Sequence, residues 1–249
     1  MKRIVRLLIT LTVFLLMVGC CNRQVQTTFF SEDVDVQEFQ TALDSSVLIG
    51  LREPDMSRGG SGSGVAFERT PEGKTRILTA GHVCDFAIRD SLEPWVVSAE
   101  HGLAQGEIVV IWGVDHRDLC IIETILEIPI AELGVLNPEF GIPIWNVSAP
   151  DGRYPVPFKG YIAGADSADA AWRVSISMYA QGGMSGSALW QDGKFVGIVA
   201  ERAIVAPHIP ISNVIQIIPS WRVLEFLNLF KKLESQWEQS DEEATSPSP

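Results

Sequence analysis

The sequence predicts an all-β protein, either a sandwich or a barrel, with one helix near the C-terminus. From Ser45 onward, short apolar runs alternate with Gly and Pro, of which the chain has 21 and 14. Short runs divided by turn residues are typical of sandwiches and barrels. Helical spacing of apolar residues occurs only after Pro219. The 249 residues, 46% of them hydrophobic and 20% charged, suffice for one large or two small domains with a packed core.

The N-terminal segment precedes that fold. Met1–Arg6 is basic, and 7–18 is an uncharged, mostly apolar run. At ~1.5 Å per residue this run is too short to cross a hydrocarbon layer of ~30 Å. We therefore interpret residues 1–19 as a signal peptide rather than a transmembrane helix. The run ends in Gly19-Cys20, which resembles the lipobox of bacterial lipoproteins. The resemblance implies that Cys20 is acylated, and a plain secretory signal or an uncleaved anchor is the alternative.

Charge and composition bound the partners. The chain has 19 basic and 31 acidic residues, a net charge of −12. Removal of the signal leaves 16 basic residues and a charge of about −15. The body of the chain contains no Lys/Arg cluster of the kind that a phosphate backbone requires, so nucleic acid is not expected as a partner. Residues 20–44 are polar and suit a tether. The resemblance to a lipoprotein signal implies that the protein lies on the periplasmic or cell-surface side of a bacterial membrane.

The predicted elements follow in chain order. Strands are expected at 46–50, 64–67, 76–79, 106–112, 119–122, 161–163, 172–176, 187–190 and 195–199. The Gly/Ser run 59–64 is interpreted as a flexible turn that enters a strand. The Pro-rich stretch 128–150 is predicted to link two β halves. Pro219-Ser220 begins a helix predicted over 219–238, and the acidic, Ser/Pro-rich residues 239–249 are predicted to form a disordered tail.

Four cysteines occur, at positions 20, 21, 84 and 120. If Cys20 carries lipid, Cys84 and Cys120 remain for a bridge in the body, and an exported protein permits one. Each of the two lies in a predicted apolar element, where a free thiol behaves as a small buried hydrophobe. We therefore favour two unpaired cysteines over a disulfide.

One histidine has an unusual setting. In Thr79-Ala80-Gly81-His82 a predicted strand runs into a turn of small residues that presents His82. The other histidines, at positions 101, 116 and 208, have no such setting. A structural role is the simpler interpretation of a lone histidine, and a catalytic one is the alternative.

An acidic residue precedes a predicted buried strand. Asp118 directly abuts the apolar run 119–122, and for this reason we prefer it to Asp115. A carboxylate in this position can orient an imidazole, hold its tautomer and stabilise the imidazolium. A turn residue at a strand start is the simpler interpretation.

The most specific pattern is Gln181-Gly182-Gly183-Met184-Ser185-Gly186-Ser187. A serine hydroxyl is a weak nucleophile until a base takes its proton. The glycines allow successive backbone N–H groups to point at one spot, and each donor of such an oxyanion hole contributes roughly 3–4 kcal/mol to the transition state. A glycine-rich hairpin without chemistry is the alternative.

Together, in the order His, Asp, Ser, these motifs resemble the trypsin-like (chymotrypsin-fold) serine proteases, above all the bacterial HtrA-like and glutamyl-endopeptidase-like branch. Two further segments support that branch. Gly62–Phe67 resembles the Gly-Ser-Gly strand before its His motif, and 217–220 followed by a helix resembles the end of the HtrA protease domain. The resemblance covers about residues 45–230.

The resemblance implies that His82 is the general base, Asp118 its orienter and Ser185 the nucleophile. The backbone N–H groups of Gly183 and Ser185 would form the oxyanion hole. The implied fold has two antiparallel Greek-key β-barrels with the active site in the cleft between them. The implied protease domain covers 45–220, with barrel one at about 45–133 and barrel two at about 134–218.

The sequence departs from the family at several points. Met184 replaces the usual Asp or Asn, and Ser187-Ala188 replaces Gly-Pro. Both changes lie outside the reacting groups, so we expect activity to survive. We expect neither a trypsinogen-like activation step nor a PDZ module. The specificity pocket is predicted to include Ala200, Glu201 and Arg202. Glu201 would favour basic substrate side chains and Arg202 acidic ones, unless both point to solvent.

The predicted function is a membrane-tethered serine endopeptidase that acts on proteins or peptides without cofactor or metal. The alternative is a catalytically silent lipoprotein that uses the protease fold for binding or as a scaffold. An α/β-hydrolase is not expected, because the chain has no Gly-x-Ser-x-Gly elbow and the nucleophile comes last. Metal chemistry is not expected either, because no His/Cys pair has ligand spacing.

Overall fold

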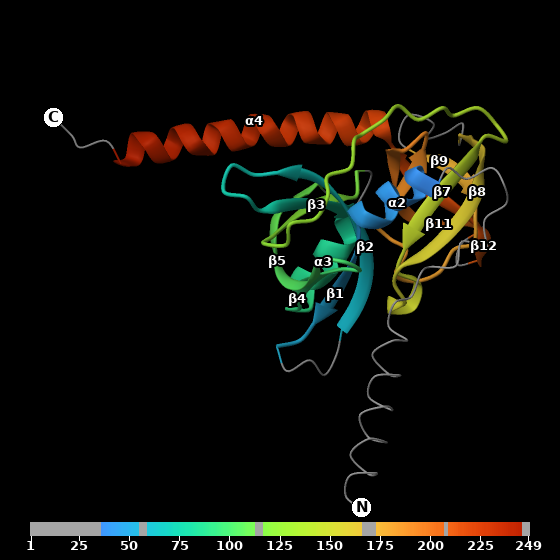
Figure 1. Ribbon diagram of the computed structural model, residues 1–249, viewed down its shortest axis with the longest axis horizontal. Coiled ribbons are helices and arrows are strands. Elements are labelled where there is room, and N and C mark those ends of the chain that lie inside the picture. The colour runs from blue at the N-terminus through green and yellow to red at the C-terminus, as the bar shows by residue number, and fades with distance from the viewer. Residues whose placement is uncertain (1–35, 55–58, 113–116, 166–172, 207–208, 246–249) are drawn as a thin grey trace, which may run out of the picture. The chain divides into compact units, whose positions relative to one another are not determined.

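The computed structural model describes residues 36–54, 59–112, 117–165, 173–206 and 209–245, and most of its elements are labelled in Figure 1. The predicted signal peptide, residues 1–19, and the predicted lipidation site Cys20 lie outside the described residues. Within the described ranges, each helix is too short or too polar to cross a lipid bilayer.

Two closed six-stranded barrels, antiparallel throughout, form the body of the structure. Barrel one contains β1 (Ser46–Arg52), β2 (Gly59–Arg69), β3 (Thr75–Ala80), β4 (Glu93–Ser98), β5 (Gly102–Trp112) and β6 (Leu119–Thr124), and barrel two contains β7 (Pro143–Ser148), β8 (Val156–Ala165), β9 (Val174–Ser177), β10 (Ala188–Gln191), β11 (Lys194–Ala206) and β12 (Ile209–Pro219). The order around barrel one is β1-β2-β3-β6-β5-β4, and around barrel two β10-β11-β12-β9-β8-β7. The predicted fold class is confirmed.

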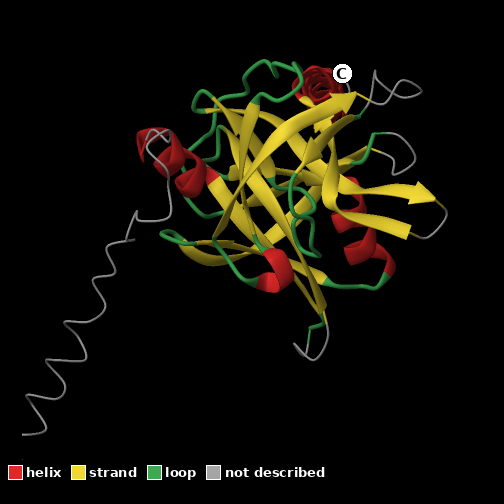
Figure 2. Cartoon of the chain, turned by 90° about the vertical axis from the view of Figure 1, so that its right-hand side faces the viewer, coloured by secondary structure: helices red, strands yellow, loops and turns green. Residues whose placement is uncertain are grey.

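The helices lie outside the strands, as Figure 2 shows. They are α2 (Val36–Ser45), α3 (Gly81–Arg89), the single 3-10 turn η1 (Pro150–Gly152) and α4 (Ser220–Thr245). α3 follows β3 without a loop, and α4 follows β12 in the same way. These two direct junctions fix where each helix starts.

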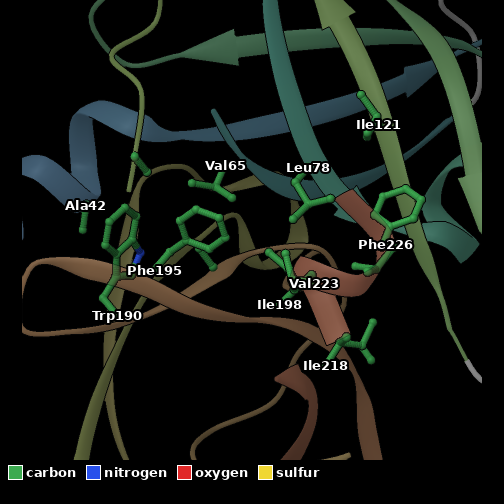
Figure 3. Close-up of a cluster of buried hydrophobic side chains, with 14 of the residues drawn as sticks. Ala42, Val65, Leu78, Ile121, Trp190, Phe195, Ile198, Ile218, Val223 and Phe226 are labelled. Atoms are coloured by element: carbon green, nitrogen blue, oxygen red, sulfur yellow. The ribbon is translucent and has the colours of Figure 1, made fainter. Parts of the chain in front are cut away.

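Each barrel encloses its own apolar core, and a third cluster joins the two barrels. Val47 and Ile77 belong to the core of barrel one, and Ile144 and Ile176 to that of barrel two. The third cluster combines residues of both barrels with the first turns of α4 (Figure 3): Val65, Leu78 and Ile121 from barrel one, Phe195, Ile198 and Ile218 from barrel two, and Val223 and Phe226 from α4. The continuous apolar surface explains why the two barrels pack against each other.

Three strands were not predicted from the sequence: β4, β7 and β12. The strand β7 begins at Pro143, inside the stretch 128–150 that was predicted to be the link. Proline is tolerated as the first residue of a strand, because its missing N–H then interrupts no ladder. The connection between the last strand of barrel one and the first of barrel two is therefore confined to residues 125–142.

The prediction of a flexible turn at 59–64 was wrong. Strand β2 begins at Gly59, and the Gly/Ser segment pairs with β1, with Gly62 opposite Ile49 and Ser63 opposite Leu48. Glycine within a strand often marks a place where another backbone approaches closely. Such an approach occurs here, because the N–H of Ser63 donates to the carbonyl of Ser185 at 2.8 Å.

The expectation of two unpaired cysteines was also wrong, because Cys84 and Cys120 form a disulfide. The β3–β6 register sets Thr79 opposite Cys120. Because α3 begins directly after β3, Cys84 comes to lie over Cys120, with 6.5 Å between the Cα atoms, a normal span for a disulfide. The spacing in sequence gave no sign of this strand pairing.

The terminal helices extend beyond the predicted elements. α2 overlaps the predicted tether 20–44 and buries Ala42 against the third cluster, beside Phe39 and Leu43. α4 continues to Thr245, past the predicted helix 219–238 and into the predicted disordered tail 239–249. Its last turns are rich in Glu and Gln, which are good helix formers even without an apolar face.

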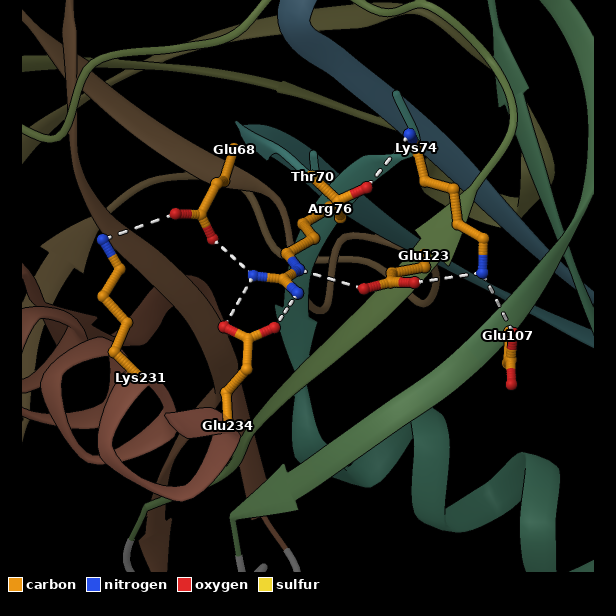
Figure 4. A network of polar contacts seen from close by, with 8 residues as sticks. All are labelled: Glu68, Thr70, Lys74, Arg76, Glu107, Glu123, Lys231 and Glu234. Atoms are coloured by element: carbon orange, nitrogen blue, oxygen red, sulfur yellow. Dashed lines mark hydrogen bonds and ion pairs between the residues drawn. The ribbon is translucent and has the colours of Figure 1, made fainter. Parts of the chain in front are cut away.

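A polar network connects α4 to barrel one (Figure 4). The guanidinium of Arg76 on β3 contacts Glu68 at 2.9 Å and Glu123 at 3.0 Å, and it also pairs with Glu234 of α4. Burial alone would lower the pKa of Arg76, but its hydrogen bonds to the three carboxylates raise it. Phe230 stacks beneath the same guanidinium, 4.9 Å away. A single buried cation thus fixes the distal part of α4 to barrel one.

Candidate active site

The pairing of two strands brings His82 and Asp118 together. In the antiparallel β3–β6 ladder, Ala80 at the end of β3 lies opposite Leu119 at the start of β6. His82, which follows Gly81 after β3, and Asp118, which precedes β6, are therefore neighbours, although 36 positions separate them in the chain. The structure thus places Asp118 beside His82, the residue that the family resemblance pairs with it.

The contact between His82 and Asp118 has three hydrogen bonds. Nδ1 of His82 lies 3.0 Å from both carboxylate oxygens, and Oδ1 also accepts the backbone N–H of His82 at 2.7 Å. The Asp118 side chain is 5% exposed and that of His82 is 37% exposed. A buried carboxylate thus holds the Nδ1 edge of the ring and leaves the rest of the imidazole open to the cavity.

The backbone of Asp118 is in the left-handed region, with φ 41°. Few residues other than glycine adopt this conformation, although Asp and Asn do so more often than most. Residues held in sparsely populated backbone regions cluster at functional sites. Among the described residues of barrel one, Asp118 is the one predicted site residue other than glycine that has a positive φ.

The segment that carries Ser185 contains two glycines that no other residue could replace without rearrangement. Gly183 has φ +89° and Gly186 has φ +85°. A Cβ atom on Gly183 would lie 2.3 Å from the carbonyl oxygen of Ala149, and one on Gly186 would lie 2.1 Å from Oγ1 of Thr79. The glycine-rich pattern therefore has a steric cause at both positions.

The first of these glycines forms a turn. The N–H of Met184 donates to the carbonyl of Gln181 at 3.3 Å. Positive φ at the third residue of the turn, Gly183, and not at the second, Gly182, is characteristic of a type II turn. The carbonyl of Gly182 accepts the N–H of Asp151 at 2.7 Å. Because a trans peptide directs its N–H opposite to its C=O, the N–H of Gly183 faces away from Asp151.

The backbone N–H groups of Gly183 and Ser185 donate to no acceptor among the residues that the structure describes. Neighbouring N–H groups in the same loop do have partners: that of Gly186 donates to Val199 and that of Ser187 to Met184. The two groups predicted for an oxyanion hole are thus free to bind a ligand, as are the N–H groups of Gln181 and Gly182, which also donate to no described acceptor.

Ser63 supports the loop from barrel one, and the sequence analysis missed it. Its Oγ donates to the carbonyl of Gly183 at 2.7 Å and accepts the N–H of Ala149 at 3.0 Å. Its own carbonyl accepts from Oγ1 of Thr79 at 2.7 Å. The sequence offered one sign of this role: Ser63 lies between Gly62 and Gly64, and glycines allow another backbone to approach a strand closely.

η1 also supports the loop. Besides its N–H contact with Gly182, Asp151 accepts a hydrogen bond from the side-chain amide of Gln181 through Oδ2. Asp151 has a positive φ of 49°. No pattern in the sequence had identified this residue.

A cavity of about 350 Å³ brings the three predicted catalytic residues together: His82, Asp118 and Ser185 all line it. The first two belong to barrel one, and Ser185 lies in the loop before β10 of barrel two. In the described chain, Ser185 and His82 make no hydrogen bond to each other. Catalytic hydrogen bonds are often long or poorly aligned before substrate binds, so this geometry is compatible with the predicted roles.

The predicted specificity residues are described only in part. Ala200 lines the cavity, next to Val199. Glu201 and Arg202 follow on β11, opposite Gln216 and Ile215 of β12, but their side chains lie outside what the structure describes. A residue that was not predicted, Arg173, also lines the cavity.

The chain matches the model of the trypsin-like peptidase domain over residues 62–198, more than half of its length. No curated protein sequence was found to match it.

Several solved structures resemble this one. A serine endoprotease from Yersinia pestis aligns with a TM-score of 0.62 and 18% identity, over 77% of this chain and 64% of its own. The Rv3671c protease from M. tuberculosis in its active form aligns with a TM-score of 0.58 and 16% identity, over 76% and 81%. Deg5 aligns with a TM-score of 0.57 and 21% identity, over 76% and 90%. This chain thus spans less than two thirds of the Yersinia protein, and at these identities the likeness concerns the fold.

Proposed function

The chain belongs to the trypsin-like peptidase family, and from this premise we propose that it is a serine endopeptidase that acts through an acyl-enzyme. The observation that carries the proposal is the arrangement around one cavity: a histidine hydrogen-bonded to a buried carboxylate, with Ser185 in the same lining. In the proposal His82 is the general base, Asp118 orients it, and Ser185 is the nucleophile.

In the first half-reaction, Oγ of Ser185 attacks the carbonyl carbon of the scissile bond while Nε2 of His82 takes the hydroxyl proton. Asp118 accepts a hydrogen bond from the Nδ1–H of His82, so that Nε2 carries no proton before the attack. The same carboxylate stabilises the imidazolium that forms. The carbonyl oxygen becomes an oxyanion, which the unpaired N–H groups of Gly183 and Ser185 would bind. Collapse of the tetrahedral intermediate breaks the C–N bond, and His82 returns the proton to the leaving amine.

In the second half-reaction, water attacks the ester carbon of the acyl-enzyme and His82 takes one of its protons. The second tetrahedral intermediate expels Ser185, which recovers its proton from His82, and a carboxylic acid leaves. One peptide bond and one water molecule are consumed, and the side chains end as they began. The chemistry requires no electron carrier.

Active-site labelling tests this proposal. A fluorophosphonate probe should label Ser185 of the folded wild-type protein, and Ser185→Ala and His82→Ala should abolish labelling and proteolysis. Ser177→Ala is the matched control, because this serine is exposed on β9 and away from the cavity. If the folded protein is not labelled and Ser185→Ala changes no turnover of a mixture of denatured proteins, the catalytically silent binding or scaffold protein is the better description.

We also propose that the protein is attached to a bacterial membrane through lipid on Cys20. The basic start, the short apolar run and Gly19-Cys20 support this. Labelled palmitate should be incorporated in cells that express the wild type, and Cys20→Ser should remove the label. Cys21→Ser is the control, because it leaves the predicted acylation site intact. Equal labelling of Cys20→Ser would overturn the assignment.

A further inference from the structure

The cavity that Ser185 lines is also lined by Arg173, whose guanidinium has one buried nitrogen without a partner in the described chain. Arg173 immediately precedes β9 and lines the cavity. Its Nη1 atom is buried and makes no hydrogen bond to any residue of the described chain. Burying a charged group without a partner is costly. An arginine in this state is therefore suited to a ligand that enters from outside.

Among the described residues of the lining, Asp118 is the one acidic side chain, and its carboxylate already accepts three hydrogen bonds from His82. The remaining described walls are mostly apolar: Ala180, Met184, Val199, Ala200 and Ile215. A chain of net charge −12 thus places a cation inside an apolar pocket beside the predicted nucleophile.

The geometry of the guanidinium matches one chemical class. Its planar fork donates two parallel hydrogen bonds to a carboxylate, and it remains charged in folded proteins. The cavity volume of about 350 Å³ is within the range of pockets that enclose small ligands. An acidic side chain can therefore place its carboxylate on Arg173 and its methylene groups against the apolar walls.

The same cavity adjoins the predicted nucleophile, Ser185. This position determines which residue of the substrate can place its side chain in the cavity. Gly182 and Ser185 line it from the loop before β10, and Val199 and Ala200 line it from β11. The substrate residue whose carbonyl is attacked by Ser185 has its Cα next to that carbonyl, so its side chain is the one within reach of the pocket.

We propose that Arg173 binds the side-chain carboxylate of the substrate residue whose carbonyl Ser185 attacks, so that the protein cleaves after Asp or Glu. The inference rests on the proposed function, because it assigns a substrate class to that same site. It differs from the expectation based on Glu201 and Arg202 of β11, since the selecting charge is that of Arg173, which precedes β9.

Peptide cleavage by the full chain tests the inference. The substrates are internally quenched peptides with amidated C-termini that differ only in the residue before the scissile bond: Glu, Asp, Gln, Ala or Lys. A site built around a charged hydrogen-bonding group rejects analogues that lack its partner. We expect kcat/KM for Glu to exceed that for Gln by about 100-fold. Equal cleavage of the Glu and Gln peptides, or a preference for Lys, would overturn the proposal.

Variants locate the selecting group. Arg173→Gln should remove the preference for Glu over Gln, and Arg173→Lys should retain part of it, because it keeps the charge but not the fork. Arg153→Gln is the matched control, since Arg153 is exposed and lies outside the lining. It should keep the full preference. Retention of the preference in Arg173→Gln would show that another group selects the substrate.

Probe labelling separates the two proposals. The fluorophosphonate should label the wild type and a folded Arg173→Gln protein alike, because it presents no acidic side chain. Peptide aldehydes that end in Glu should protect wild-type Ser185 at about 100-fold lower concentration than those that end in Gln. Labelling without this difference rejects the role of Arg173 and leaves the serine protease intact. A folded wild type that the probe does not label rejects the proposed function itself.

Discussion

Oγ of Ser63 donates a hydrogen bond to the carbonyl oxygen of Gly183 at 2.7 Å, across 120 positions of the chain. The donor lies on β2 of barrel one, and the acceptor lies in the loop that carries Ser185. The same hydroxyl accepts the N–H of Ala149 at 3.0 Å. One buried side chain therefore holds two segments of barrel two in register with barrel one.

Ser63→Ala should reduce kcat more than it raises KM, because the change leaves the Gly183 carbonyl and the Ala149 N–H without a partner and frees the loop. The stability cost of such buried unpaired groups is about 1–3 kcal/mol. Steady-state kinetics and urea unfolding measure the two effects. Ser177→Ala, an exposed serine of β9, should change neither. A Ser63→Ala protein with wild-type kcat would show that the loop keeps its geometry unaided.

Asp118→Asn should lower kcat by roughly 10³–10⁴-fold, because an amide neither stabilises the imidazolium nor selects the productive tautomer of His82. The loss should appear both in peptide hydrolysis and in the rate of probe labelling. Asp192→Asn is a suitable control, since Asp192 is exposed in the β10–β11 turn and its positive φ of 50° is compatible with Asn. A fall of less than 10-fold for Asp118→Asn would contradict the assigned role.

The double variant Cys84→Ala/Cys120→Ala should be less stable by about 3–4 kcal/mol, from the loop-closure entropy of a cross-link that joins residues 36 positions apart. Guanidinium unfolding of the oxidised wild type and of the variant measures the difference. The reduced wild type should have a guanidinium midpoint close to that of the double variant. If reduction leaves the midpoint of the wild type unchanged, the bridge contributes nothing to stability.

Arg76→Ala should destabilise the protein by about 3–5 kcal/mol, because it leaves Glu68, Glu123 and Glu234 together without their shared cation. Thermal unfolding provides the measurement. Arg89→Ala is the matched control: its ion pairs with Asp85 and Asp90 are exposed and contribute about 0–1 kcal/mol. Equal effects of the two substitutions would mean that burial of Arg76 is unimportant.

Stability should decrease above a pH of about 10, in part through Tyr154. Burial, with the charge of Asp44 as a second cause, raises the pKa of this phenol, whose hydroxyl donates to the carbonyl of Ser46 at 2.5 Å. The folded state therefore retains the Tyr154 proton above the unfolded-state pKa of about 10. Its contribution is complete below that pH and is lost as the pH rises. Tyr154→Phe should flatten the alkaline decline of the urea midpoint, whereas Tyr161→Phe, at an exposed site, should not.

The parts of the molecule that could be predicted are those encoded in contiguous residues. The apolar runs gave most strands, and the His82, Asp118 and Ser185 motifs each stand out locally. The contribution of Ser63 could not be predicted, because it depends on β2 passing beside a loop far along the chain.

Other features depend equally on long-range pairing. The Cys84–Cys120 bridge follows from the β3–β6 register, which the sequence does not display. Arg173 gave no local signal, because an arginine before a strand normally faces water. β7 was missed because Pro143 reads as a linker residue, although it only begins the strand. The prediction of paired barrels succeeded because a resemblance supplied the topology that residue patterns lack.

The dependence of the Ser185 loop on both barrels also orders events during synthesis. Domains generally fold from the N-terminus as the chain grows, so barrel one can present His82 and Asp118 before Ser185 has been translated. The loop then still requires Val199 of β11, which accepts the N–H of Gly186, and β11 is completed only by pairing with β12. Under the proposed function, a nascent chain cannot hydrolyse its neighbours, because the reacting groups meet only when the second barrel closes.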